Sequence, residues 1–348
     1  METRTLKRLP LDRKLLDRLL EVGQGVFGLA VLFMVGRFIY LNWRNVSSVD
    51  FQLNIAYFFV ACIFLALFYL LYTATWQRLL KWISSEAQDI RRITLHRVFF
   101  SSLLTRYLPA GKVVNVGSRI ELYHRAGGRR LIAAQSLILD QVYLMGGALV
   151  IGWCALAFLP GYELPGELPA FRWIFLTAGV LLVLLLVFAA DKLLVWFLRI
   201  TDLSTRYGIG FTFAINQRLE IFVRYLAINL LQGSAAFFFL LSVYRDLYNV
   251  GGFALAYIAA YPIGRLVGQI AVVVPGGLGV REGVYALLIS AYTPVQAAML
   301  GAGIVRLASV LMELVINTVV VAVEKQSEQP ALRESVHPMD QDSGGKER

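Results

Sequence analysis

The sequence has 348 residues, of which 58% are hydrophobic and 16% charged, with a mean hydropathy of +0.64 and a formal net charge of +10. Soluble domains carry about 25% charged residues, so this composition excludes a soluble globular protein and predicts an integral membrane protein. Apolar segments of about 20 residues, the length that crosses a bilayer, account for most of the chain. We therefore expect no separate soluble enzyme domain.

Eight apolar segments predict an all-α polytopic fold of about eight transmembrane helices within 22–323. In chain order they cover 22–43, 54–76, 131–159, 173–197, 219–244, 253–274, 283–292 and 294–323. The seventh is too short to cross alone, and we expect it to belong to a broken hairpin at 270–292. A basic segment at 1–21 precedes the spans, and the polar composition of 324–348 predicts a disordered tail.

The distribution of lysine and arginine predicts that both termini are cytoplasmic. With the amino terminus inside, 24 of the 33 basic residues fall in inner segments and three in outer loops. This asymmetry follows the positive-inside rule and predicts a multi-pass protein of the cell's inner (plasma) membrane. A basic inner face attracts anionic headgroups, so we expect membrane lipids, and not nucleic acid, as partners.

Signatures of soluble chemistry are missing from the sequence. Cys62 and Cys154 each stand alone in an apolar run, and the three histidines are scattered. No hydrolase or nucleotide-binding pattern occurs. We therefore predict no catalytic residue, no metal site and no cofactor, and favour a translocase over an enzyme.

The first informative region is a re-entrant or interfacial segment expected at 93–120, where apolar stretches alternate with basic residues. Pro109 and Gly111 break the helix there, and a membrane tolerates such a break only beside protein or water. The surrounding residues form a candidate phosphate site: Arg106, Lys112, Asn115 and Arg119. A basic amphipathic loop on the inner leaflet explains the same residues equally well.

The second informative region is the break between the sixth and seventh segments, marked by Pro275, Gly276, Gly277 and Gly279. Discontinuous helices of this kind often build the substrate sites of transporters. Arg281 and Glu282 follow the break and would supply a headgroup-binding cation and its acidic partner. An ordinary cytoplasmic turn is the alternative, but it does not require so many glycines.

Charged residues inside the spans are the third feature. Each is costly at the bilayer centre and should face a partner or a polar cavity. Arg265 and Arg306 are candidates for the deeper part of a substrate groove, with Asp140 and Glu313 as supporting acids. For any one of these charges, a structural pair between helices is the alternative to a ligand contact.

These residues carry a resemblance to a known family. The stretches Tyr107-Leu108-Pro109-Ala110-Gly111-Lys112 and Gly117-Ser118-Arg119, followed by Pro275-Gly276-Gly277-Leu278-Gly279-Val280-Arg281-Glu282-Gly283, resemble the transmembrane region of lysylphosphatidylglycerol synthases, a flippase-like family. The resemblance runs from about the first span to the eighth. It implies movement of a lipid between leaflets, without the synthase activity of the soluble domain in full-length members.

The same resemblance bears on the lipid. Asn115 stands where the branch fused to synthases has an aspartate, which favours stand-alone relatives acting on phosphate-bearing, polyprenyl-linked or other glycolipids over a cationic lysyl-lipid. The resulting hypothesis is passive or ion-coupled transport of an anionic lipid. The alternative is a membrane-embedded accessory subunit or transferase in polyprenyl-glycolipid or phospholipid modification, with a lipid-modifying enzyme or glycosyltransferase as partner. A homo-oligomer is compatible with either hypothesis.

Overall fold

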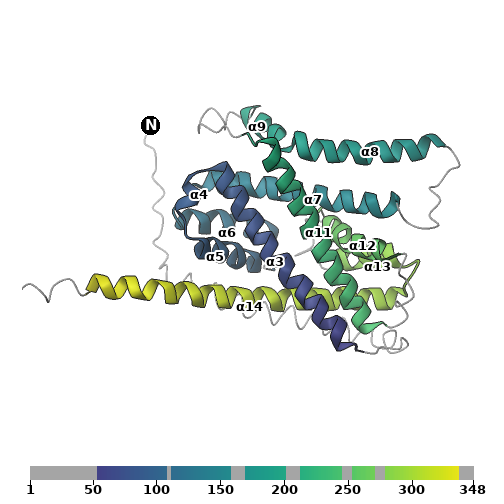
Figure 1. Ribbon diagram of the computed structural model, residues 1–348. Helices are drawn as coiled ribbons and strands as arrows, with labels where there is room; N and C mark the ends of the chain where they lie inside the picture. The colour runs from purple at the N-terminus through teal and green to yellow at the C-terminus, as the bar shows by residue number, and fades with distance from the viewer. Residues whose placement is uncertain are drawn as a thin grey trace, which may run out of the picture.

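The computed structural model describes residues 53–107, 111–157, 169–200, 212–244, 253–270 and 279–336, whose regular elements are all α-helices (Figure 1). The all-helical fold class is therefore confirmed for these ranges. In chain order the helices are α3 (Ile55–Ile83), α4 (Glu86–Asp89), α5 (Arg92–Thr105), α6 (Gly111–Arg125), α7 (Arg130–Ala157), α8 (Pro169–Phe188), α9 (Ala190–Ile200), α11 (Ile215–Val243), α12 (Ala254–Ile270), α13 (Val280–Ile289) and α14 (Val295–Val336).

Four described helices are long and apolar enough to cross a membrane: α3, α7, α11 and α14. Helices α8 and α9, bent by 63° at their junction, give a fifth if they count as one span. Helices α3, α7, α11 and α14 match the second, third, fifth and eighth predicted spans, and α8 with α9 matches the fourth. The first predicted span, 22–43, lies outside the described residues. The total of about eight is not confirmed, because α12 and α13, where the sixth and seventh were expected, have only 17 and 10 residues.

The core is built from apolar and aromatic faces of these helices. Trp76 of α3 packs against Phe99 of α5, and its indole N–H donates to Ser136 of α7 at 3.2 Å. Helix α3 begins where the Asn54 side chain accepts a hydrogen bond from the Tyr57 amide. Helix α14 continues past the predicted end of the last span to Val336.

Helices α5 and α6 form a hairpin that lies at one end of the molecule, on the left of Figure 1. Thr94 of α5 donates a hydrogen bond to Glu324 of α14 at 2.8 Å. Further along α5, Ser101 donates to Asn317 at 3.0 Å. The residue numbers of these contacts rise along α5 while they fall along α14, so the two helices are antiparallel. The tip of the hairpin therefore points toward the middle of α14.

Helices α12 and α13 lie at the other end, on the right of Figure 1, and α12 is antiparallel to α7. Ala259 clusters with Ala155, and Ile263 lies against Gly152. The chain between α12 and α13, 271–278, lies outside the described residues. The two hairpins therefore enter the helical bundle from opposite ends, and α6 and α13 both begin at the inner ends of their hairpins.

The arrangement of span, hairpin and span occurs twice. The first set is α3, α5–α6 and α7, and the second is α11, α12–α13 and α14. Helices α3 and α11 are antiparallel, because the Asn54 amide donates to the Ser242 carbonyl at 2.7 Å while Arg78 pairs with Glu220. Each hairpin packs against the last span of the other set, α5 on α14 and α12 on α7. The two sets are thus inverted relative to one another, as in many secondary transporters.

Two hydrogen bonds repeat between the sets. The Tyr69 hydroxyl of α3 donates to the Ser309 carbonyl of α14 at 3.5 Å, and the Asn229 amide of α11 donates to the Leu144 carbonyl of α7 at 3.1 Å. Tyr69 and Asn229 stand at the same position in their helices, counted from the first residues, Ile55 and Ile215. The two acceptors, Ser309 and Leu144, also stand at matching positions in α14 and α7. The inverted relationship therefore extends to individual contacts.

Two glycines allow α12 and α13 to pack closely. A Cβ atom on Gly264 would lie 2.8 Å from the Arg281 carbonyl oxygen, and one on Gly268 would lie 3.0 Å from the Arg281 Cβ. Glycines four residues apart let membrane helices approach one another closely. The position of Arg281 therefore depends on this pair.

Gly264→Ala is expected to lower the melting temperature of the purified protein by several degrees, because the added methyl group collides with backbone. Gly283→Ala is the matched control, since a Cβ there meets nothing within 4 Å. Thermal unfolding in detergent measures both. Equal melting temperatures for the two variants would contradict the close approach.

Candidate functional site

The inner ends of the two hairpins meet at a cavity of about 570 Å³, a size typical of ligand sites. Both hairpins and all four long spans contribute to its walls. The charged lining of the described part consists of five arginines, namely Arg106, Arg119, Arg265, Arg281 and Arg306. Residues far apart along the chain thus place their guanidinium groups around one space.

The structure brings most of the predicted substrate-binding residues to this cavity. The five arginines and Asn115 line it, and Glu282 lies beside it through its contact with Arg306. The Lys112 side chain lies outside the described part of the structure, as do Pro109, Pro275, Gly276 and Gly277. The binding role of the gathered residues stays a prediction.

Two of the predicted break residues are described. Gly111 begins α6, and a Cβ atom there would lie 2.0 Å from the Arg106 carbonyl oxygen, so no side chain fits the turn. Gly279 precedes α13 with φ +81°, a conformation that glycine adopts readily. Both hairpins therefore need glycine beside the cavity.

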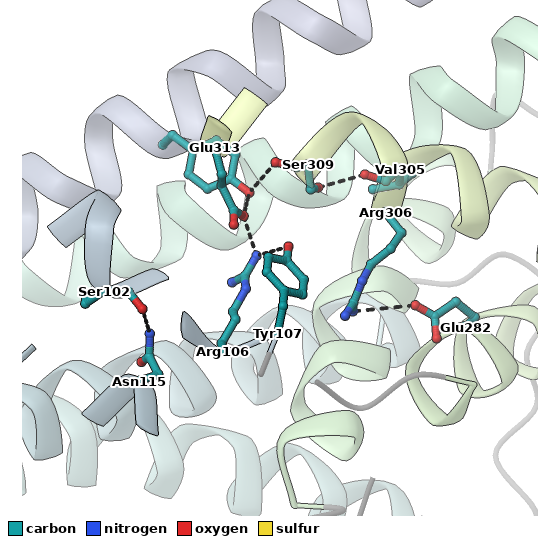
Figure 2. A network of polar contacts seen from close by, with 10 residues as sticks. Ser102, Arg106, Tyr107, Asn115, Glu282, Val305, Arg306, Ser309 and Glu313 are labelled. Carbon is teal, nitrogen blue, oxygen red and sulfur yellow. Dashed lines mark hydrogen bonds and ion pairs between the residues drawn. The ribbon is translucent and has the colours of Figure 1, made fainter. Parts of the chain in front are cut away.

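Arg106 and Glu313 form the closest ion pair of the site. Arg106 follows α5, and Figure 2 shows its guanidinium directed at the Glu313 carboxylate of α14. The Tyr69 hydroxyl of α3 donates to the same carboxylate oxygen. The Glu313 side chain is fully buried, whereas that of Arg106 is 31% exposed and lines the cavity. Glu313, expected as a supporting acid, thus lies in direct contact with a basic residue, Arg106.

Tyr107 lies between two of the arginines (Figure 2). The Arg106 guanidinium lies 4.9 Å from the centre of its ring and that of Arg306 lies 5.4 Å away. Arg306 also approaches Glu282 at 3.8 Å. Glu282 in turn accepts a hydrogen bond from the Gly279 amide at 2.8 Å, which caps the start of α13. The Tyr107 ring therefore lies within cation–π distance of both guanidinium groups.

Arg119 is positioned by the first hairpin. Its Nε donates to the Ser102 hydroxyl at 2.8 Å, and its guanidinium lies 4.4 Å from the centre of the Phe99 ring. The Asn115 amide donates to the Ser102 carbonyl oxygen (Figure 2). Ser102 of α5 therefore fixes Arg119 and Asn115 of α6, and both of these residues line the cavity.

Arg265 and Arg281 come from the second hairpin. Arg265 donates to the Asn229 side-chain oxygen at 2.6 Å, a neutral partner. Arg281 stacks 4.7 Å from the centre of the Tyr261 ring, and its buried Nε donates no hydrogen bond to any described residue. Neither arginine has a carboxylate within 4 Å in the described ranges. No described carboxylate therefore compensates either charge by direct contact.

Asp140 is held by residues other than those expected. Its carboxylate accepts hydrogen bonds from the hydroxyls of Tyr72, at 2.9 Å, and Tyr225, and from the Gln141 amide. No arginine lies within ion-pair distance of it among the described residues. Asp140 therefore fixes the polar wall of the cavity through tyrosines, and it does not orient a base by direct contact.

Sequence reasoning missed the polar residues of α3 and α11 that line the cavity, Tyr69, Tyr72 and Gln232, and those that hold Asp140 and Arg265, Tyr225 and Asn229. A signal was available in their spacing. Tyr69 and Tyr72 stand three residues apart, and the polar residues of α11 recur at spacings of four and three, which places each set on one helix face. Polar stripes within apolar spans indicate a wet interior.

The described ionisable groups of the site are unbalanced. Against five guanidinium groups stand three carboxylates, Asp140, Glu282 and Glu313, so two positive charges are in excess when all are ionised. The inner ends of α6 and α13 add the partial positive charge of helix N-termini. The cavity therefore favours an anion, and arginines are suited to phosphate oxygens.

Basic residues also gather at the exposed outer end of the first hairpin. Arg129 pairs with Glu86 at 2.8 Å, and Arg130 and Arg125 pair with Glu121. The hydrogen bonds from Arg130 and Arg125 lower the pKa of the Glu121 carboxyl. These exposed pairs lie away from the cavity and contribute little to stability.

Apolar spans, inverted hairpins and a cationic cavity define a class of protein, the multi-pass membrane proteins with discontinuous helices. The chain belongs to the family described as the lysylphosphatidylglycerol synthase transmembrane region, whose sequence profile matches residues 22–316. This confirms the resemblance seen in the sequence and identifies a membrane protein of a lipid-related family. A search of curated proteins finds no match.

Proposed function

We propose that this protein moves an anionic, phosphate-bearing lipid between the leaflets of a membrane. The observation that carries the proposal is the convergence on one cavity of four arginines from two oppositely directed hairpins and a fifth, Arg306, from α14. Transporters commonly place substrate sites where discontinuous helices meet. The lipid phosphate would bind among the arginines while its hydrocarbon chains stay in the apolar surroundings.

The charge excess favours a phosphate monoester or a diphosphate over a diester headgroup. A monoester carries about −1.5 to −2 charges at neutral pH, close to the two positive charges in excess. Polyprenyl phosphates and polyprenyl-diphosphate-linked sugars belong to this class, and a phosphatidylglycerol headgroup carries only one charge. A cationic lysyl-lipid would meet repulsion from the same arginines.

A second cavity of about 510 Å³ supports an amphipathic substrate. Its lining is almost wholly apolar and includes Gly152, Gly179, Ala259 and Ile263. It adjoins the arginine-lined cavity along α7 and α12, since the first cavity is lined by Met145 of α7 and the second begins at Leu149. Such a surface suits a hydrocarbon chain.

The proposed setting is the cell's inner membrane, with both termini in the cytoplasm. The excess of basic residues in the inner segments supports this orientation. The exposed arginines at the end of the first hairpin away from the cavity would then contact the headgroups of the cytoplasmic leaflet, where the lipid would enter.

The test is a headgroup-accessibility assay with purified protein in liposomes. Polyprenyl phosphate is expected to change leaflets faster than in protein-free vesicles, while lysylphosphatidylglycerol, the cationic control lipid, is not. Movement of the cationic lipid alone would contradict the proposal. If neither lipid moves, but a co-purifying enzyme modifies a lipid only when this protein is present, the accessory role is favoured instead.

A further inference from the structure

We propose that Glu313 is a proton-binding site that couples anion binding in the cavity to proton uptake. A phosphate that binds Arg106 would replace the Glu313 carboxylate as its partner, and the released carboxylate would take a proton from water. This inference rests on the proposed function, because it assigns the coupling ion of the same site.

The geometry of Glu313 carries the first step. Its side chain is fully buried in a membrane-spanning helix. One carboxylate oxygen accepts hydrogen bonds from Tyr69 and Arg106, and the other, Oε2, accepts none from any described residue. Arg106 therefore compensates the charge, and a carboxylate that lost this partner would be an unpaired buried anion.

Arg106 is the member of the pair that a ligand can reach. It lines the cavity and is 31% exposed, while Glu313 lies behind it. An anion in the cavity meets the open side of the guanidinium and competes with the carboxylate for its charge. The exchange balances at Arg106: a phosphate oxygen takes the place of the carboxylate as its negative partner, and the proton forms an O–H bond on Glu313 and removes the charge that was displaced.

Other ionisable groups around Glu313 cannot replace Arg106 as its partner without moving. Those near it are Tyr69 of α3, Tyr107 after α5 and Arg306 of α14, and Arg306 faces Glu282 of α13. Tyr69 already directs its only proton at Glu313, with the Ser309 carbonyl oxygen as a more distant second acceptor. Uptake of a proton is therefore the direct way to neutralise the carboxylate.

The second half of the molecule provides an internal comparison. At the place in α11 that corresponds to Tyr69, the neutral Asn229 holds Arg265 at 2.6 Å. An uncharged partner is thus sufficient to position an arginine at this cavity. The carboxylate at Glu313 adds a group that can change its charge, and the Asn229 amide cannot.

The experiment measures binding of dioctanoyl phosphatidic acid to the purified full chain in detergent at pH 7 and pH 8. Uptake of one proton per anion predicts about tenfold weaker binding at the higher pH. The second ionisation of the probe's phosphate has the opposite effect on affinity, because the dianion formed at the higher pH binds arginines more tightly. Glu313→Gln is expected to bind more tightly than wild type at pH 8 and to lose the weakening.

Glu324→Gln is the matched control. Glu324 is also a buried carboxylate of α14 and pairs with Arg97 outside the cavity, so binding to this variant should weaken with pH as binding to the wild type does. Wild-type affinity that does not fall with pH, or a Glu313→Gln protein that retains the fall, overturns the proposal. If Glu313→Gln does not fold, calorimetry of the wild type in buffers of different ionisation enthalpy counts the protons, and a count of zero overturns it.

The proton-coupling and transport proposals fail separately. Binding that weakens with pH in a protein that moves no lipid in liposomes would remove transport and keep Glu313 as a proton site. Lipid movement with pH-independent binding would remove the proton site alone. Failure to bind the probe at either pH would remove both.

Discussion

Arg281→Gln is expected to weaken binding of a phosphate monoester lipid by roughly 10- to 100-fold, the loss of one charge-assisted hydrogen bond. The guanidinium is buried at the cavity, stacks on Tyr261 and has no carboxylate partner among the described residues. Removing it therefore leaves no unpaired acid behind, and the effect should fall on the ligand and not on the fold. Calorimetric titration with dioctanoyl phosphatidic acid measures it.

Arg78→Gln is the control for this loss of binding. Arg78 is half-exposed, pairs with Glu220 and does not line the cavity. Its removal should leave the dissociation constant unchanged. The proposed role of Arg281 fails if both variants bind as the wild type does, or if Arg281→Gln retains the wild-type rate of lipid movement in liposomes.

Arg106→Gln is expected to have the largest effect on stability, about 3 kcal/mol, because it leaves the Glu313 carboxylate buried without its charged partner. The double variant Arg106→Gln/Glu313→Gln should recover most of this loss while binding phosphate lipid weakly. Thermal unfolding in detergent measures stability, and titration with the same probe measures binding.

An exposed pair gives the comparison for this second effect. Arg125→Gln breaks an ion pair with Glu121 in which both side chains are more than 40% exposed, so the expected loss is below about 1 kcal/mol. If Arg106→Gln is no less stable than Arg125→Gln, Glu313 is not a buried charge that depends on Arg106. Failure of the double variant to regain stability would lead to the same conclusion.

The sequence predicts the residues that line the cavity better than it predicts the span count. The helix breaks and the isolated arginines stand out locally, because clusters of proline and glycine interrupt a helix and charge is rare inside apolar spans. Helices α12 and α13 look like spans by hydropathy, and only their length and their packing against α7 and α14 reveal a hairpin. Hydropathy reports burial in an apolar medium and does not report whether a helix crosses it.

The partners of the charged residues could not be predicted in the same way. Glu313 and Tyr69 are 244 positions apart, and Asp140 and Tyr225 are 85 apart. Such contacts depend on how the two inverted halves fit together, which no local pattern contains. The expectation that Asp140 orients a base was reasonable for an isolated acid in a span, but two tyrosine hydroxyls satisfy its carboxylate.

The packing of each hairpin on the final span of the other half has a consequence for how the protein assembles. Helix α5 completes its contacts only when α14 has been made, and α12 rests on α7 from the first half. The halves are interlocked, and neither has a complete interior alone. A gene divided between α9 and α11 should therefore yield a folded protein only when both fragments are produced together in one membrane.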